Sequence, residues 1–301
     1  MLIGIDWGGT KIEAIALSEA GETLARTRVA TPRDYDRAVT AATRLVHDIE
    51  RSLGRNGSVG VGIPGALSPS TGLVRNANSV WMNGKPLDRD LARALDRPVR
   101  IENDANCFAV SEAIDGAGEG GKVVWGVILG TGAGSGIAID GRPLSGPHKV
   151  AGEWGHNPLP WPRDDERPGP PCFCGKSGCL ETFVSGTGFA ADHARRTGET
   201  LRAEEIVARM RRGDAAASAS FDIYLDRLGR GMAHVIHILD PDVIVLGGGM
   251  SDVDEIYGQL PARIAPWVLT DAFVTPVRKN RHGASSGVRG AAWLWGRYPS
   301  P

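Results

Sequence analysis

The sequence has little that would suit a charged polymer or a bilayer as a partner. Its 301 residues carry 34 Lys and Arg against 35 Asp and Glu, so no basic surplus favours nucleic acid or an anionic membrane surface. No apolar run has the length of a membrane span, and the first residues lack the basic and apolar segments of a secretory signal. We therefore expect a cytoplasmic protein that binds neither nucleic acid nor membrane.

Several common catalytic motifs are also missing. No G-x-G-x-x-G stands between a strand and the helix of a βαβ unit, which argues against a nicotinamide dehydrogenase. There is no H-E-x-x-H pair and no G-x-S-x-G elbow, the motifs of common metalloproteases and hydrolases. Gly175-Lys176-Ser177 resembles the end of a Walker A loop, but Pro170 stands where that motif requires glycine.

Glycine, in contrast, is abundant: its 41 residues gather in short turns after apolar runs. Leu2–Ile5 predicts a strand, Asp6–Lys11 a turn, and the alternating residues 12–17 a returning strand. Backbone N–H groups in such a turn form a concavity that suits phosphate, and Asp6 at the strand end is placed to hold hydrated Mg²⁺. An ordinary Gly-Gly hairpin is the alternative interpretation.

The same pattern recurs later in the chain. Val123–Leu129 predicts a strand, a glycine-rich turn follows, and residues 137–141 return. Two such turns facing each other would enclose a polyphosphate, although a duplication kept only as scaffold is the alternative. After the apolar strand 242–246, Gly247-Gly248-Gly249 would let an adenine or ribose lie against backbone, unless it is a plain strand-to-helix turn. The predicted ATP-binding residues are Gly4, Ile5, Asp6, Trp7, Gly8, Gly9, Thr10, Lys11, Gly130, Thr131, Gly132, Ala133, Gly134, Ser135, Gly136, Gly248 and Gly249.

Three of the four cysteines lie within eight residues, at Cys172, Cys174 and Cys179, with His156 upstream. Their C-x-C-x4-C spacing and the nearby histidine make up the Cys3His ligand set of a structural zinc site. Three sulfurs cannot all pair into disulfides, and free, incidental cysteines are the alternative. Glu153 and Glu181 flank this segment, and fixed carboxylates suit the hydroxyl groups of a polyhydroxylated ligand.

An acidic residue stands at the start of a predicted helix. Val99–Glu102 predicts a strand, and Asn103-Asp104-Ala105-Asn106 follows where the chain enters the helix. An aspartate at this junction is most often an N-cap. The same carboxylate would serve as general base if a substrate hydroxyl came within about 3 Å.

These motifs together closely resemble those of the ROK family of sugar kinases, over essentially the whole chain. The resemblance rests on Asp6–Lys11, Asn103–Asn106, the turn at Gly130-Thr131-Gly132, and Glu153-Trp154-Gly155-His156 before the cysteines. Within the family the sequence looks most like bacterial fructokinases, through Asn76–Ser79, Trp81 and the segment Ala151–Trp161. The N-acetylglucosamine kinases of the family share most of these motifs.

The resemblance implies an α/β protein with the actin-like ATPase, ribonuclease H-like fold, in which two α/β domains enclose an active-site cleft. We expect an N-terminal domain at residues 1–117, completed by a C-terminal helix at 287–301, and a larger domain at 118–286 that carries the zinc loop. By position in the family motifs, Asp104 would be the general base, and Asn78, Asn103, Glu153, His156 and Glu181 would contact the sugar or orient the residues that do. His156 would also complete the zinc site with Cys172, Cys174 and Cys179, one ring nitrogen for each role.

The expected reaction is ATP-dependent phosphorylation of a hexose with Mg²⁺, D-fructose to fructose 6-phosphate first. N-acetylglucosamine, glucose and mannose are alternative substrates, and a non-catalytic sugar-sensing regulator is the alternative of another class. A homodimer is the expected assembly, because it is the commonest one among soluble oligomers.

Overall fold

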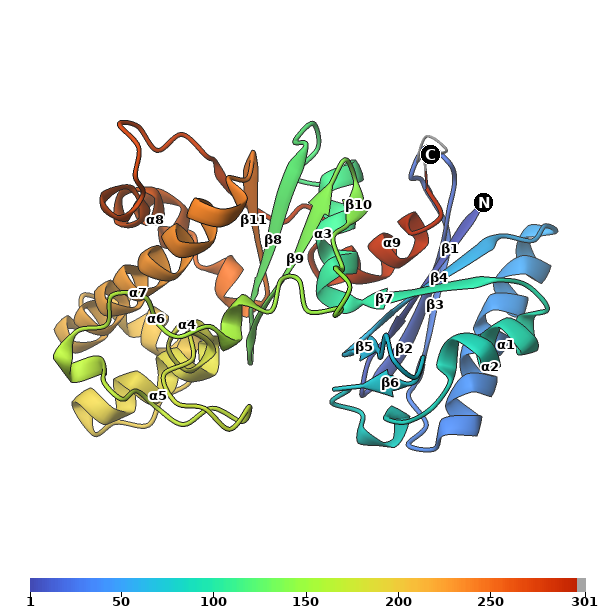
Figure 1. The fold of residues 1–301 in the computed structure, drawn as a ribbon, viewed down its shortest axis with the longest axis horizontal. Coiled ribbons are helices and arrows are strands. Elements are labelled where there is room, and N and C mark those ends of the chain that lie inside the picture. The colour runs from blue at the N-terminus through green and yellow to red at the C-terminus, as the bar shows by residue number, and fades with distance from the viewer. Residues whose placement is uncertain (297–301) are drawn as a thin grey trace. The chain divides into compact units, whose positions relative to one another are not determined.

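The computed structural model describes residues 1–296, which form two compact units (Figure 1). Unit 1 consists of residues 1–120, 136–151 and the chain from Arg281 onward, and unit 2 of residues 121–135 and 152–280. Residues 297–301 of the expected C-terminal helix lie outside the described residues. Among the described helices, none combines the length and apolar character that crossing a membrane would require.

Unit 1 is built on a five-stranded sheet of order β3-β2-β1-β4-β7. Its strands are β1 (Leu2–Trp7), β2 (Lys11–Leu17), β3 (Thr23–Ala30), β4 (Ser58–Ile63) and β7 (Val99–Asn103). The first three pair antiparallel, whereas β4 and β7 run parallel to β1. The carboxyl ends of β1, β4 and β7 therefore share one edge of the sheet, where Asp6 and Asn103 lie.

Helices cover the two faces of this sheet. On one face lie α1 (Tyr35–Leu53) and α2 (Leu87–Leu95), and on the other α3 (Asp104–Asp115) and α9 (Ser286–Trp293). The apolar stripe of α1 packs into the core through Ala38, Ala42, Leu45 and Ile49. Glycine allows α9 to approach the sheet, since a Cβ at Gly4 would lie 2.0 Å from the Val288 carbonyl oxygen. Unit 1 also contains β5 (Ala66–Leu67), β6 (Val74–Arg75) and β10 (Arg142–Pro143).

The second sheet repeats the order of the first. Its order is β10-β9-β8-β11-β12, with β8 (Val123–Leu129), β9 (Ala133–Ile139), β11 (Val243–Gly247) and β12 (Val277–Lys279). As β4 and β7 do in the first sheet, β11 runs parallel to β8 and β12 parallel to β11. β9 starts in unit 2 and ends in unit 1. The predicted α/β class is confirmed, and the strand–turn–strand pattern read twice in the sequence is part of a larger repeat.

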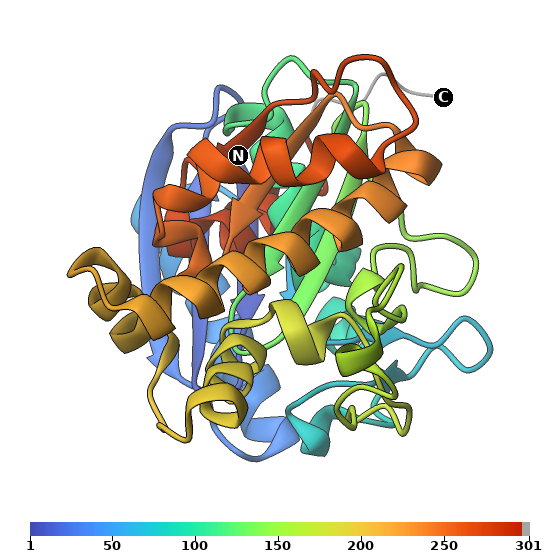
Figure 2. The same ribbon diagram turned by 90° about the vertical axis from the view of Figure 1, so that its left-hand side faces the viewer.

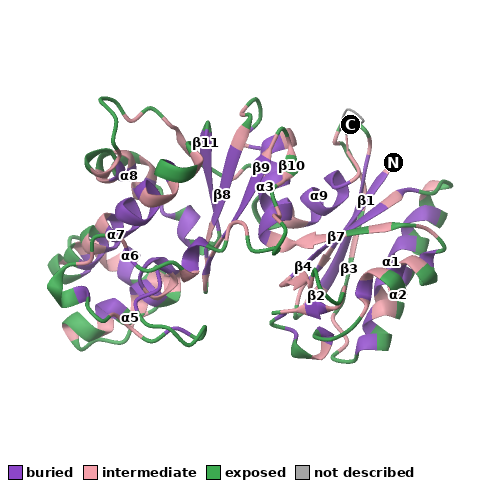
Figure 3. Ribbon diagram, in the orientation of Figure 1, coloured by how far each residue is buried: buried purple, intermediate pink, exposed green. Residues whose placement is uncertain are grey.

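The helices of unit 2 are α4 (Glu181–Val184), α5 (Gly186–Thr197), α6 (Ala203–Arg211), α7 (Ala215–Leu239) and α8 (Glu255–Ile264). The long α7 is prominent in Figure 2, with α8 beside it. The apolar stripe of α7 is largely buried, including Phe221, Leu225, Leu228 and Met232. Burial is concentrated in the central strands of both sheets and on one side of the longer helices (Figure 3).

Candidate functional site

Unit 1 places the predicted base, Asp104, in the first turn of α3, but this residue is not the N-cap. Asn103 is the cap: its Oδ1 accepts the N–H groups of Ala105 at 2.9 Å and Asn106 at 3.3 Å. The Nδ2 group of Asn103 donates to the Gly65 carbonyl at 3.2 Å, so both ends of this amide hold the chain in place. Asn103 thus performs the capping role that competed with catalysis in the interpretation of Asp104.

Three carboxylates of unit 1 act electrostatically on one buried thiol. Burial raises the pKa of Cys107, and the charges of Glu102, Asp104 and Asp6 raise it further. Burial also raises the pKa of Asp6, an effect that Lys11 partly offsets and Glu13 reinforces. The end of β1 and the start of α3 therefore form one acidic region, where a divalent cation would be electrostatically favoured.

The glycine turn after β1 exposes only part of the predicted nucleotide segment. Gly9 and Thr10 are exposed at the turn, which the Gly8 N–H closes by donating to the Lys11 carbonyl at 2.9 Å. Ile5 and Trp7 are fully buried and α9 covers Gly4, so their influence on a ligand is indirect. The ammonium group of Lys11 lies 2.6 Å from the buried carboxylate of Glu13, which also binds Arg26.

The predicted sugar contact Asn78 lies in an exposed loop of unit 1. Asn83 braces this loop, because its Oδ1 accepts the Ala77 N–H at 2.9 Å and its Nδ2 donates to the Ala77 carbonyl at 3.1 Å. Sequence reasoning did not single out Asn83, since a turn asparagine has no distinctive local signal.

In unit 2, the first residues of β9, directly after the glycine turn, are held by bonds from distant segments. Glu181 Oε2 accepts the Ala133 N–H at 3.0 Å, and the Trp154 indole N–H donates to the Gly134 carbonyl at 3.1 Å. The Ser135 hydroxyl donates to the Gly152 carbonyl at 2.8 Å. Of the predicted residues in unit 2, Glu181 is therefore tied to the strand that follows the glycine turn, while Glu153, next to Trp154 in sequence, is exposed.

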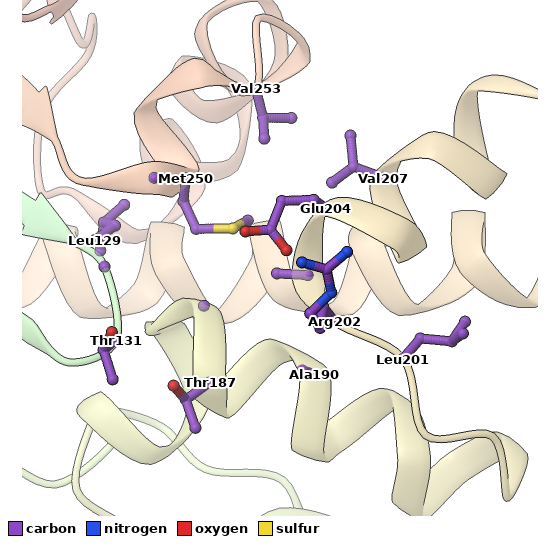
Figure 4. A pocket seen from close by; sticks show the side chains of 14 residues that line it. Leu129, Thr131, Thr187, Ala190, Leu201, Arg202, Glu204, Val207, Met250 and Val253 are labelled. Carbon is purple, nitrogen blue, oxygen red and sulfur yellow. The ribbon is translucent and has the colours of Figure 1, made fainter.

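The same turn borders a pocket of about 530 Å³ within unit 2 (Figure 4). Three predicted nucleotide residues line it, namely Gly130, Thr131 and Gly249. Most of the rest of the lining was missed from the sequence, because it comes from helices and their ends, whose spacing shows only amphipathic character. It includes Thr187, Ala190, Arg202, Glu204, Val207, Met250 and Val253. Gly248 is not among the lining residues. With φ at +80° and a Cβ position 2.5 Å from the Leu129 carbonyl oxygen, it is a turn glycine.

The predicted metal ligands come together in unit 2. One ligand atom from each of His156, Cys172, Cys174 and Cys179 lies within 4.8 Å of the other three. The Nδ1 of His156 faces the Cys172 sulfur at 3.6 Å, and the Cys174 and Cys179 sulfurs are 3.6 Å apart. Burial and the neighbouring thiols raise the pKa of Cys179 to about 12. Because a divalent cation stabilises thiolates, this donor set fits Zn²⁺.

Three comparisons with known proteins each match nearly the whole chain. The model of the ROK family matches residues 2–297. An N-acetyl-D-glucosamine kinase of Pectobacterium carotovorum subsp. carotovorum (strain PC1) is 42% identical over 299 residues, 98% of this chain and 98% of that protein. A ROK hexokinase of Thermus thermophilus is 32% identical with a TM-score of 0.87, covering 97% of each chain. A ROK glucokinase of Streptomyces griseus, solved with glucose and AMPPNP, is 30% identical with a TM-score of 0.74, over 97% of this chain and 98% of that one.

These structural neighbours confirm the predicted actin-like ATPase fold. The expected closeness to fructokinases is not confirmed, because the relatives above are described as kinases of other sugars.

Proposed function

Because the chain belongs to the ROK family, as its motifs predicted, we propose that it is a sugar kinase that transfers the γ-phosphate of ATP to a hexose. The observation that supports this most is the arrangement in unit 1. There Asn103 caps α3, which begins at Asp104, and the charges of Asp104 and Asp6 both act on the buried thiol of Cys107. A base and a cation-binding acid at one sheet edge are what phosphoryl transfer to a hydroxyl requires.

In the proposed mechanism, Asp104 accepts the proton of the sugar hydroxyl as that oxygen attacks the γ-phosphorus. Each glycine turn, Gly8–Lys11 and Gly130–Gly136, would contact phosphate through its exposed residues, Gly9 and Thr10 in the first and Thr131 in the second. Asp6 would hold Mg²⁺ through water, and the bound ion would offset the negative charge of the phosphates. The first helical turn of α3 places Asp104 at the positive end of the helix dipole.

The pocket in unit 2 is the proposed nucleoside site. Its apolar lining from Leu129, Val207, Met250 and Val253 would cover the faces of a base, as Figure 4 illustrates. It adjoins Gly130 and Thr131, so a base there would lead its phosphates toward the glycine turn.

We propose N-acetyl-D-glucosamine as the preferred sugar, because a relative described as a kinase of this sugar is 42% identical over 98% of the chain. D-Fructose is the second candidate, supported by the motifs Asn76–Ser79 and Ala151–Trp161. Asn78, Glu153, His156 and Glu181 are the proposed sugar contacts, with Asn103 in an orienting role. The His156 ring, with Nδ1 toward Cys172, has Nε2 available for such a contact.

We also propose one structural Zn²⁺ per chain at His156, Cys172, Cys174 and Cys179. Homodimerisation and a cytoplasmic location stay predictions, to be checked by sedimentation and by cell fractionation.

The decisive experiment measures ADP release from Mg-ATP with N-acetylglucosamine, fructose, glucose and mannose in parallel, with a no-sugar control. We expect sugar-dependent release, fastest with N-acetylglucosamine. A faster rate with fructose would favour the second candidate. Sugar binding without ADP release from any of the four would refute the kinase proposal and support the sugar-sensing regulator.

A further inference from the structure

Two segments that carry predicted metal ligands also brace the glycine turn between β8 and β9. Glu181 follows Cys179 by two residues, and Trp154 precedes His156 by two. Each forms a hydrogen bond to the first residues of β9, directly after this turn, as described above. All of these residues lie within unit 2.

The contact at Glu181 is close as well as directional. Besides the bond to the Ala133 N–H, its Oε2 lies where a side chain at residue 132 would have to go, 2.5 Å from the Cβ position of Gly132. The backbone that carries Glu181 is anchored by the fully buried Leu180. The position of this carboxylate therefore follows the position of the segment Cys179–Glu181.

The contact at Trp154 comes from the other side of the metal cluster. The Trp154 ring is buried and packs edge-on against Trp125 of β8, with ring centroids 5.3 Å apart. Next to it, a Cβ at Gly155 would lie 1.9 Å from the Ala133 carbonyl oxygen, so only glycine permits this approach to the turn. The segment Gly152–His156 thus lies directly against the turn.

A turn this rich in glycine has many accessible conformations, and a ligand that needs one of them must bear the cost of ordering it. We propose that Glu181 and Trp154 are positioning residues that couple the metal cluster to the glycine turn, so that metal occupancy sets nucleotide affinity. The nucleotide part rests on the proposed kinase function. The coupling itself concerns only the shape of the turn, and it is testable without any nucleotide.

The first test is hydrogen exchange in the ligand-free protein, followed in peptides that cover residues 130–135. Glu181→Ala is expected to speed exchange of the Ala133 amide, and Glu181→Gln, which keeps an acceptor oxygen, to restore most of its protection. Trp154→Phe tests the second brace while keeping an aromatic ring. Glu255→Gln, at an exposed ion pair with Arg211, is the matched control and is expected to change nothing. Unchanged protection in Glu181→Ala would overturn the proposal, whether or not the protein is a kinase.

The second test measures ADP affinity by calorimetry without sugar, in zinc-loaded and chelator-treated protein. Chelation is expected to weaken ADP binding to the wild type about tenfold, the scale of one hydrogen bond to a charged group. Glu181→Ala is expected to weaken ADP binding to a similar degree, and chelation to add little further. Equal effects of chelation on the wild type and on Glu181→Ala would overturn the coupling through Glu181. If Glu181 served only as a sugar contact, its loss would leave ADP affinity unchanged.

Discussion

The stability of unit 2 should depend strongly on one buried carboxylate, Glu166, which lies in the loop between the metal ligands His156 and Cys172. Its Oε1 accepts from Arg227 Nε at 2.8 Å and Arg230 Nη2 at 2.7 Å. Its Oε2 accepts from Arg230 Nη1 at 2.9 Å and from the Arg163 N–H at 2.8 Å. The side chains of Glu166, Arg227 and Arg230 are at most 2% exposed. This carboxylate therefore fixes the loop to α7.

Glu166→Gln removes the charge. It also replaces one acceptor oxygen with an NH₂ group, which then faces the arginine donors. Loss of one partner of a buried ion pair typically costs about 3–5 kcal/mol, because the remaining charge is left uncompensated. Asp192 lies 2.8 Å from Arg227, and Asp226 lies 2.9 Å from Arg230. Because these carboxylates still compensate the arginine charges, we expect the lower end of that range, about 3 kcal/mol. At roughly 2–4 °C per kcal/mol for a domain of this size class, the melting temperature should fall by roughly 6–12 °C.

The pH dependence of the free energy of unfolding tests the same carboxylate independently. Burial alone would raise the pKa of Glu166, but the bonds from Arg230 and Arg227 outweigh it and lower the pKa to about 2 from an ordinary 4.5. Because the folded pKa is the lower one, this contribution is fully present above about pH 4.5 and is lost as the pH falls toward 2. The stability gap between wild type and Glu166→Gln should thus be constant from pH 7 to about 5 and narrow below.

Thermal and urea unfolding of both proteins across this pH range would measure the gap. Glu255→Gln is the control, since its partner Arg211 is 47% exposed and a surface pair contributes about 1 kcal/mol or less. If Glu166→Gln lowered stability no more than Glu255→Gln does, or if the gap widened on acidification, the reasoning would be wrong.

Three further predictions concern the base, the metal and the packing of α9. Asp104→Asn should lower kcat by about 10²–10⁴ and leave ADP affinity unchanged, as steady-state kinetics and calorimetry would show; near-normal turnover would remove Asp104 from the mechanism. Purified protein should hold about one zinc per chain by elemental analysis, and chelation should lower its melting temperature; active, metal-free protein would contradict this. Gly290→Ala should destabilise by about 1–3 kcal/mol or more in urea titrations, because its Cβ would lie 1.6 Å from the Cys107 carbonyl oxygen. Gly258→Ala in α8, where nothing lies within 4 Å of the new Cβ, should be neutral or slightly stabilising.

Several features followed from the sequence alone. The spacing of Cys172, Cys174 and Cys179 predicted a metal cluster, and the structure brings their ligand atoms together with His156. The pattern of a strand, a glycine turn and a strand, found twice in the sequence, recurs in the structure at corresponding places in two sheets of corresponding order. Such features are local: each is encoded by residue types within about a dozen positions, where chain geometry leaves few alternatives.

Other features depended on the tertiary structure. The sequence could not decide whether Asp104 caps α3, because Asn103 is an equally good cap and only the folded backbone assigns the role. It could not show that Glu181 accepts the Ala133 N–H, since 48 residues separate the two. Nor could it show that the helical residues Thr187 and Val207 line a pocket with Gly130. Contacts of this kind arise when distant segments pack on a shared sheet, and helical periodicity indicates which face is buried but not what that face meets.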